Sequence, residues 1–354
     1  MNASRLKTLF TGLCLVLGLV FVLAGCKKET PPPQEPSATS TEEQAAKQKE
    51  FLSDPDVVTC KLEKTTISKL DFPKNQLPSF VLRMEREDRE KIKQGQITLA
   101  NRPFKILLGE RPESEFFLFD VERGFGPYWW GSWSLHSYHK IDDEFFEFML
   151  IEGDTKIAAR PYKGQLGTIK VSKGGRNLEK VEFNGSLHQR GSIGVPIGTI
   201  KEHWTSPVAE CEIPVGDYTP YLMTVTYDNL SIEISNNYHT NAKGQSSGKA
   251  TVYGMQVRKD KPYVLDFSNE PMVVFDQPPL SKTTFSRGEE IRFAAVLIDP
   301  NLDIMIRGLD DTSVQVEKEA SNGSKYTRAK SLDPNVVITR ADGKSVVEGV
   351  MPFG

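Results

Sequence analysis

Short runs of alternating apolar and polar residues, separated by turn residues, recur along most of this chain. A period of two places every second side chain on the same face of a strand, so such runs are typical of half-buried β-strands. Closely spaced strands with few helical stretches between them predict an all-β protein built from sandwich-like sheets. The runs lie at residues 97–108, 169–183, 221–234, 291–297 and 336–347.

Four of these runs contain turn residues near their centre and therefore predict β-hairpins. An Asp-Gly pair, which the last of the four contains, is among the strongest hairpin signals. The run Ile291–Leu297 has no such centre and predicts a single strand. The predicted turns are Asn101-Arg102, Lys173–Arg176, Asp228-Asn229 and Asp342-Gly343.

One helix is predicted, at Glu85–Gln94. Glu87 and Lys91 lie four residues apart there, which places opposite charges on one helix face. Arg89 and Lys93 have the same spacing and repel each other, so the support from charge is small.

The folded part of the chain is long enough for two domains, because roughly 300 residues usually divide into more than one core. We place a boundary near Glu210, with an N-terminal β-rich domain at 51–210 and a C-terminal β-sandwich domain at 211–354. Residues 213–218 contain the sequence Pro-x-Gly-x-Tyr. This motif resembles the opening turn of many exported bacterial sandwich domains.

Residues 27–50 have the composition of a disordered tether. They include no aromatic residue and no Val, Ile, Leu or Met, so this segment has nothing to bury in a core. Pro31–Pro33 favour an extended polyproline conformation at its start. We therefore predict that residues 26–50 separate the folded domains from the N-terminal segment.

Residues 1–26 have the pattern of a secretory signal peptide. Arg5 and Lys7 form a short positive region, and Leu9–Leu23 is an apolar run without charge. Residues 23–26 then read Leu-Ala-Gly-Cys, which resembles the lipobox of bacterial lipoproteins. The resemblance implies that residues 1–25 are removed and that Cys26 carries the acyl chains, palmitate among them, that anchor the protein to a membrane.

An uncleaved transmembrane helix is the alternative for this segment, since about 18 apolar residues span a bilayer. The cysteine directly after Leu-Ala-Gly favours cleavage. The same family resemblance implies a location, because Lys27 is not the aspartate that retains lipoproteins at the inner membrane. We therefore expect a cell-envelope protein in the outer membrane, with its domains in the periplasm or at the cell surface.

The charge of the chain disfavours nucleic acid as a partner. Removal of Arg5 and Lys7 with the signal leaves 42 basic residues against 47 acidic ones, a net charge of −5. No basic patch with interleaved aromatic residues offsets this balance. The sequence also contains no nucleophile motif and no glycine-rich phosphate loop, so it gives no catalytic residue and no cofactor.

Two cysteines stay in the mature chain besides Cys26, because Cys14 leaves with the signal. These are Cys60 and Cys211. Export to an oxidising compartment favours a disulfide between them. Two buried thiols are the alternative.

An aromatic cluster is the main candidate for ligand binding. It consists of Tyr128, Trp129, Trp130 and Trp133, preceded by glycines that favour a loop. Tryptophan rings on a loop can stack on the apolar faces of sugars, whereas the same rings in a core would bury a large area. Both interpretations stay open on sequence alone.

Two clusters contain possible metal ligands, but for each of them we favour an ordinary turn over a metal site. His136, His139 and Asp142 supply nitrogen and oxygen ligands, but residues three apart on a strand face opposite ways. Asp299, Asn301 and Asp303 imitate the start of a calcium loop, but Ile304 stands where that loop needs glycine. We expect a solvated turn at the first place and a tight turn between strands at the second, and we assign no metal.

The whole layout resembles uncharacterised exported β-rich lipoproteins of environmental bacteria. These proteins end in Asp-Gly-Lys, a short strand and a terminal glycine, as this chain does at residues 342–354. The resemblance implies an architecture without an activity. We expect a lipid-anchored envelope protein with a non-catalytic binding or scaffolding role, whose partner is a glycan or an envelope protein. A carbohydrate-binding or carbohydrate-active protein is the alternative.

Overall fold

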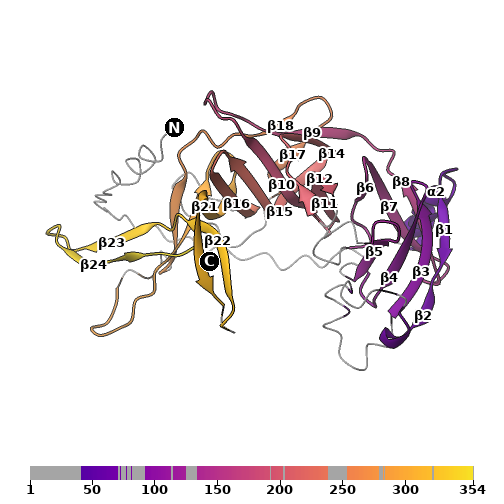
Figure 1. Cartoon of the computed structure of the whole chain (residues 1–354), viewed down its shortest axis with the longest axis horizontal. Helices are drawn as coiled ribbons and strands as arrows, with labels where there is room; N and C mark the ends of the chain where they lie inside the picture. The colour runs from indigo at the N-terminus through magenta and orange to yellow at the C-terminus, as the bar shows by residue number, and fades with distance from the viewer. Residues whose placement is uncertain are drawn as a thin grey trace. The chain divides into compact units, whose positions relative to one another are not determined.

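A computed structural model describes most of the chain beyond the N-terminal segment (Figure 1). The chain forms two compact units, Met1–Lys49 and Glu50–Gly354. The predicted signal peptide, Cys26 and the first part of the predicted tether lie outside the described residues. The described residues are 41–70, 72, 77, 81, 92–112, 115–124, 134–191, 193–201, 204–237, 253–278, 282, 284–320 and 323–353.

The predicted all-β class is confirmed. The described residues form many antiparallel strands, one α-helix and one short 3-10 helix, Ile67–Lys69. No helix among them is both long enough and apolar enough to cross a membrane.

Two four-stranded antiparallel sheets enclose the first hydrophobic core. One has the order β2-β3-β4-β5 and the other β1-β8-β7-β6 (Figure 1). The core between them contains Phe104, Phe116, Leu135 and Phe148. The strands are β1 (Val58–Lys61), β2 (Glu63–Thr65), β3 (Ile92–Leu99), β4 (Arg102–Leu108), β5 (Phe116–Asp120), β6 (His139–Ile141), β7 (Glu144–Ile151) and β8 (Lys156–Pro161).

The hairpin predicted at residues 97–108 is confirmed. Strands β3 and β4 pair in antiparallel register, with Leu99 opposite Arg102. The two turn residues are Ala100 and Asn101, whose φ angles are 47° and 61°. Two residues at positive φ match the twist of the flanking strands, and asparagine tolerates this conformation.

A nine-stranded sheet and a three-stranded sheet contribute to the second core. The larger one has the order β11-β10-β15-β16-β21-β20-β19, with β17 added to β15 and β22 to β21. The smaller has the order β14-β9-β18, and its β18 runs parallel to β9. The strands are β9 (Leu166–Val171), β10 (Val181–Gln189), β11 (Ile193–Ile197), β14 (Glu210–Pro214), β15 (Gly216–Tyr227), β16 (Leu230–Asn237), β17 (Met255–Val257), β18 (Tyr263–Leu265), β19 (Met272–Gln277), β20 (Ala294–Asp299), β21 (Ile304–Glu319) and β22 (Lys325–Ser331).

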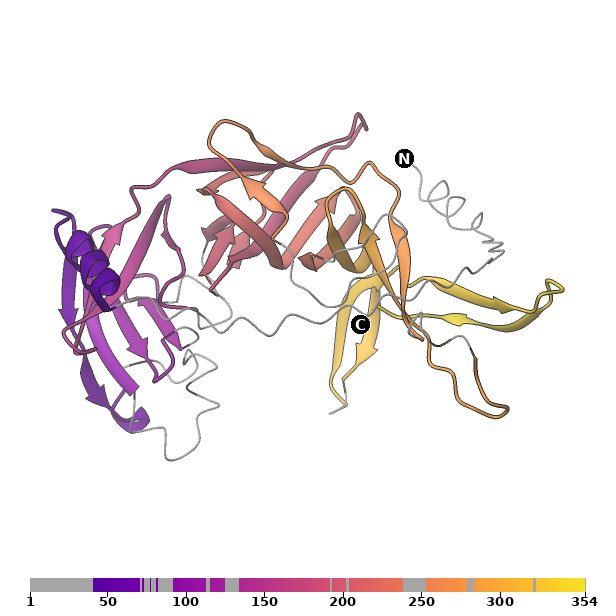
Figure 2. The same cartoon turned by 180° about the vertical axis from the view of Figure 1, so that it is seen from behind.

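Two further hairpins stand apart from these sheets. Strands β12 (Thr199–Lys201) and β13 (Trp204–Ser206) pair only with each other among the described residues. The predicted C-terminal hairpin is confirmed as β23 (Asn335–Thr339) and β24 (Ser345–Val350), drawn in yellow in Figure 2. The hairpin predicted around Asp228-Asn229 is also confirmed, since β15 and β16 pair directly across this turn.

The hairpin predicted at residues 169–183 is wrong. Strand β9 pairs with β14 and β18, whereas β10 pairs with β11 and β15. The glycines at the predicted turn, Gly174 and Gly175, do adopt positive φ angles of 55° and 69°. They turn the chain from one sheet to another. The sequence therefore predicted the turn correctly, but β9 and β10 do not pair across it.

Three predicted element boundaries change. The predicted tether is wrong over its last residues, because helix α2 spans Thr41–Leu52. Its Glu, Gln, Ala and Lys residues are strong helix formers, and Phe51 at its end is buried beneath Arg160. The helix predicted at Glu85–Gln94 is wrong for residues 92–94, which belong to β3; residues 85–91 lie outside the described part. The strand predicted from Ile291 begins only at Ala294.

The predicted domain boundary near Glu210 does not coincide with a division of the cores. Glu210 is the first residue of β14, which pairs with β9 from the predicted N-terminal domain. Side chains on both sides of that residue, from Phe145 to Ile306, share the second core. The Pro-x-Gly-x-Tyr motif lies inside this core, where the Tyr218 hydroxyl donates a hydrogen bond to the Pro214 carbonyl oxygen.

The predicted disulfide is not present, because Cys60 and Cys211 are both free thiols. Cys60 packs against the first core and Cys211 against the second, so the two side chains belong to different clusters. Burial raises the pKa of each thiol to about 11. The alternative interpretation, two largely buried thiols, describes the structure.

Candidate functional site

The aromatic cluster lies between β5 and β6 in the chain. Its four residues, Tyr128, Trp129, Trp130 and Trp133, fall in residues 125–133, which are outside the described part of the structure. We call residues 125–133 the aromatic segment. The structure describes the chain on both sides of it, and these two flanks hold its ends.

The first flank is a turn at the end of β5 that is held by Asp120. Its Oδ1 atom accepts hydrogen bonds from the N–H groups of Glu122, at 3.1 Å, and Arg123, at 3.0 Å. The N–H group of Gly124 donates to the Asp120 carbonyl oxygen at 2.9 Å, and Gly124 has a φ angle of 74°. An aspartate that accepts backbone N–H groups just after itself is typical of a fixed turn.

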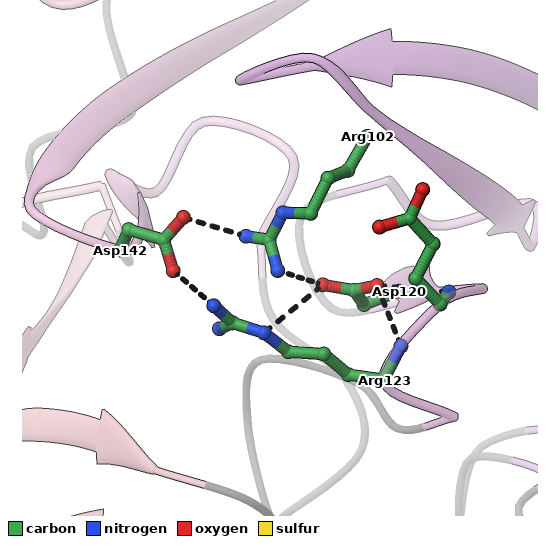
Figure 3. Close-up of polar contacts among 5 residues, drawn as sticks. Arg102, Asp120, Arg123 and Asp142 are labelled. Atoms are coloured by element: carbon green, nitrogen blue, oxygen red, sulfur yellow. Dashed lines mark hydrogen bonds and ion pairs between the residues drawn. The ribbon is translucent and has the colours of Figure 1, made fainter.

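Asp120 also belongs to a cluster of four charged residues, shown in Figure 3. We call Arg102, Asp120, Arg123 and Asp142 the charge cluster. Arg102 lies 2.7 Å from Asp120 and 2.8 Å from Asp142. Arg123 lies 2.6 Å from the other oxygen of Asp142 and 3.9 Å from Asp120. Two guanidinium groups and two carboxylates thus neutralise one another.

The charge cluster joins three places that are separate in the sequence. Arg102 begins β4, Asp120 ends β5, and Asp142 lies in the turn between β6 and β7. Only 13 % of the Arg102 side chain and 5 % of the Asp120 side chain are exposed, and the Arg102 guanidinium lies 5.6 Å from the Phe104 ring centroid. A pair so shielded from water is weakly screened by salt. The charge cluster therefore fixes the first flank to the start of β4 and to the turn between β6 and β7.

The second flank is a compact turn around Ser134. Its hydroxyl oxygen accepts a hydrogen bond from the His136 N–H group at 3.2 Å, and its carbonyl oxygen accepts one from the Ser137 N–H group at 3.0 Å. The next residue, Leu135, is buried in the first core, and its N–H group donates to Pro112 at 2.7 Å. The chain therefore re-enters the sandwich at a position fixed by packing.

The weak metal candidates do not converge. His136 is exposed, whereas His139 is buried edge-on against Phe116 at 4.9 Å, and Asp142 is paired with two arginines. Burial lowers the pKa of His139 to about 3, so this imidazole is neutral at physiological pH. Among the described residues, no three His, Cys, Asp or Glu side chains are grouped so that they could hold a metal ion.

The calcium-like sequence forms the tight turn that we expected. Asp299 ends β20, and its Oδ1 atom accepts hydrogen bonds from the N–H groups of Asn301, at 2.9 Å, and Leu302, at 3.0 Å. Asp303 adopts a φ angle of 53° just before β21 begins. The Asp299 carboxylate oxygen thus accepts hydrogen bonds from the backbone of its own turn.

The charge cluster was missed by the sequence analysis. Its members are far apart in the chain, and no spacing links them. One local signal was available, because Asp120 ends an apolar strand and is followed by Val-Glu-Arg-Gly, a combination typical of an aspartate-held turn.

The described fold and flanks define an all-β protein in which a two-sheet sandwich fixes both ends of an aromatic segment. Comparisons with protein-family models, with curated proteins and with solved structures each gave no match to this chain.

Proposed function

We propose that this chain is a lipid-anchored protein of the cell envelope with a non-catalytic binding role, and that the aromatic segment contacts its ligand. The lipobox-like sequence at residues 23–26 supports the anchor. The fixed flanks at Asp120–Gly124 and Ser134–His139 support the binding role, and they carry the proposal.

Fixed flanks matter because binding costs the conformational entropy of the groups that become ordered. A segment whose two ends are already bonded to a sandwich loses less freedom when it binds than a segment with free ends. Binding residues are commonly placed on such connections between strands of a stable scaffold. Three tryptophans and a tyrosine on this segment would supply a large, stiff contact area.

A glycan is the ligand that this site would suit best. Tryptophan rings offer flat apolar faces to sugar rings, and sugar hydroxyl groups need charged or polar partners beside those faces. Arg123 lies in the first flank and pairs with Asp142, and 41 % and 44 % of their side chains are exposed. They would supply a donor and an acceptor next to the aromatic segment. An envelope protein is the other partner that this role allows.

Retention of the full-length protein on immobilised envelope glycans tests the proposal. Trp130→Ala should abolish retention and leave the unfolding transition unchanged if the ring contacts the ligand. The matched control is Tyr326→Ala, which removes a 48 % exposed ring from β22. A loss of about 3–5 kcal/mol of stability from Trp130→Ala would instead mark a core residue. No retention of the intact protein on any glycan would refute the glycan as ligand.

A further inference from the structure

Tyr221 on β15 is exposed where the alternation of the strand would bury it. Met223, Val225 and Tyr227 follow at intervals of two residues, and all three are buried in the second core. Tyr221 continues the same alternation but is 49 % exposed. The departure from the pattern therefore needs a structural cause.

The cause is a β-bulge between β10 and β15. Ser186 lies opposite Leu222, and Leu187 lies opposite Pro220, so Tyr221 is the extra residue between them. A bulge of this kind turns a side chain to the other face of the sheet. It moves Tyr221 from the core face to the outer face.

On that outer face, Tyr221 stacks on His188. The two ring centroids lie 4.2 Å apart, and the ring planes differ by only 8°. Burial lowers the pKa of His188, which favours the neutral imidazole. One face of the tyrosine ring is therefore covered and held in place by His188, while the exposed fraction of Tyr221 leaves the ring accessible to a ligand.

A cationic group follows directly after β10. Arg190 is the first residue of the turn that follows β10, two residues after His188. Its guanidinium lies 5.6 Å from the ring centroid of Tyr253. A guanidinium group thus lies two residues along the chain from His188, the residue that supports the accessible tyrosine ring.

We infer that Tyr221, supported by His188 and accompanied by Arg190, forms a second binding site that takes a saccharide carrying a carboxylate. The tyrosine ring would contact the apolar face of the sugar. The guanidinium fork of Arg190 would pair with the carboxylate, for which its geometry is well suited. Polynucleotides fit less well, because their affinity depends on several basic residues along the backbone and this site offers one.

Binding of oligogalacturonate to the full-length protein, measured by calorimetry, tests this inference. Tyr221→Ala and Arg190→Gln should each weaken binding by about tenfold or more, a loss of about 1.4 kcal/mol. The methyl-esterified oligomer, which lacks the carboxylates, should bind as weakly to the intact protein as oligogalacturonate binds to Arg190→Gln. Tyr326→Ala, which removes an equally exposed ring from β22, should bind normally.

The two proposals rest on different residues, so they can fail separately. Trp130→Ala should leave the binding of oligogalacturonate at Tyr221 intact. Tyr221→Phe keeps the stacked ring and should retain binding even if Tyr221→Ala folds poorly. Unchanged affinity in Tyr221→Ala, no binding by the intact protein, or tighter binding of a single-stranded oligonucleotide would overturn the inference.

Discussion

The Nη1 atom of Arg102 lies 2.7 Å from the Oδ2 atom of Asp120, in an ion pair that is almost completely shielded from water. Removal of one member of such a pair leaves the other charge buried without its partner, and this costs far more than the pair itself contributes. The pair therefore makes the first flank of the aromatic segment sensitive to single substitutions.

Asp120→Ala should lower the free energy of unfolding by about 3 kcal/mol, because Arg102 loses its buried partner and the following turn loses its acceptor. Asp142→Ala, which removes the exposed carboxylate of the same cluster, should cost no more than about 1 kcal/mol. Urea denaturation of both variants measures the difference. Equal losses would show that the burial of Asp120 contributes nothing.

Acid should destabilise the protein through His139. The pKa of this side chain is lowered by burial to about 3, whereas an unfolded histidine titrates near 6.5. The unfolded state therefore binds the proton more tightly, so the stabilising effect is complete above pH 6.5 and is lost as the pH falls toward 3. The loss approaches about 1.4 kcal/mol for each pH unit.

Denaturation of the wild type and His139→Gln at pH 7 and pH 5 isolates this effect. The stability of the wild type should fall more than that of the variant between the two pH values. His136→Gln, at an exposed position, serves as the control and should follow the wild type. Parallel pH dependence of all three proteins would contradict the expected role of His139.

With Cys14 and Cys26 accounted for by the proposed cleavage and lipidation, thiol titration should find two free thiols per chain under denaturing, non-reducing conditions, because Cys60 and Cys211 are unpaired with each other. Burial raises the pKa of both thiols to about 11, so at pH 8 few thiolates form in the folded state. Modification of the folded protein should therefore be slow. A denatured chain without free thiols would show that Cys60 and Cys211 do form a disulfide.

The proposed lipidation of Cys26 predicts a specific effect of cysteine substitution. Cys26→Ser should leave an unprocessed precursor, since the residue that accepts the lipid is lost. Cys14→Ser changes a cysteine inside the apolar run and should be processed normally. Intact-mass analysis of membrane extracts distinguishes the two. A mature wild-type chain without a lipid mass, or one that retains Met1, would disprove the anchor.

The hairpins that could be predicted from the sequence are those whose whole signal is local. The β3–β4 and β15–β16 pairs join neighbouring runs through turns of two residues, and Asn101 and Asp228 at those turns adopt positive φ. The pairing of β9 could not be predicted in this way. Its partners β14 and β18 come much later in the chain, and alternation gives the face of a strand but not its neighbour.

The same distinction between local and long-range signals holds for the candidate site. The aromatic segment was identifiable because its residues are adjacent in the sequence. Arg102, Asp120 and Asp142 meet only because the registers of two sheets bring three strand ends together, and no local pattern encodes that meeting. Tyr221 shows the reverse case, because local alternation predicted its burial and a bulge in the pairing with β10 prevented it.

The pairing of β9 also sets the order in which the chain can fold. Residues 166–171 must wait for residues 210–214 on one side and residues 263–265 on the other before the three-stranded sheet is complete. Contacts so distant in sequence slow folding, because the intervening chain must be closed into loops first. A chain that lacks the later strands therefore leaves β9 without either neighbour, and the second core can close only when residues as late as Ile306 are available.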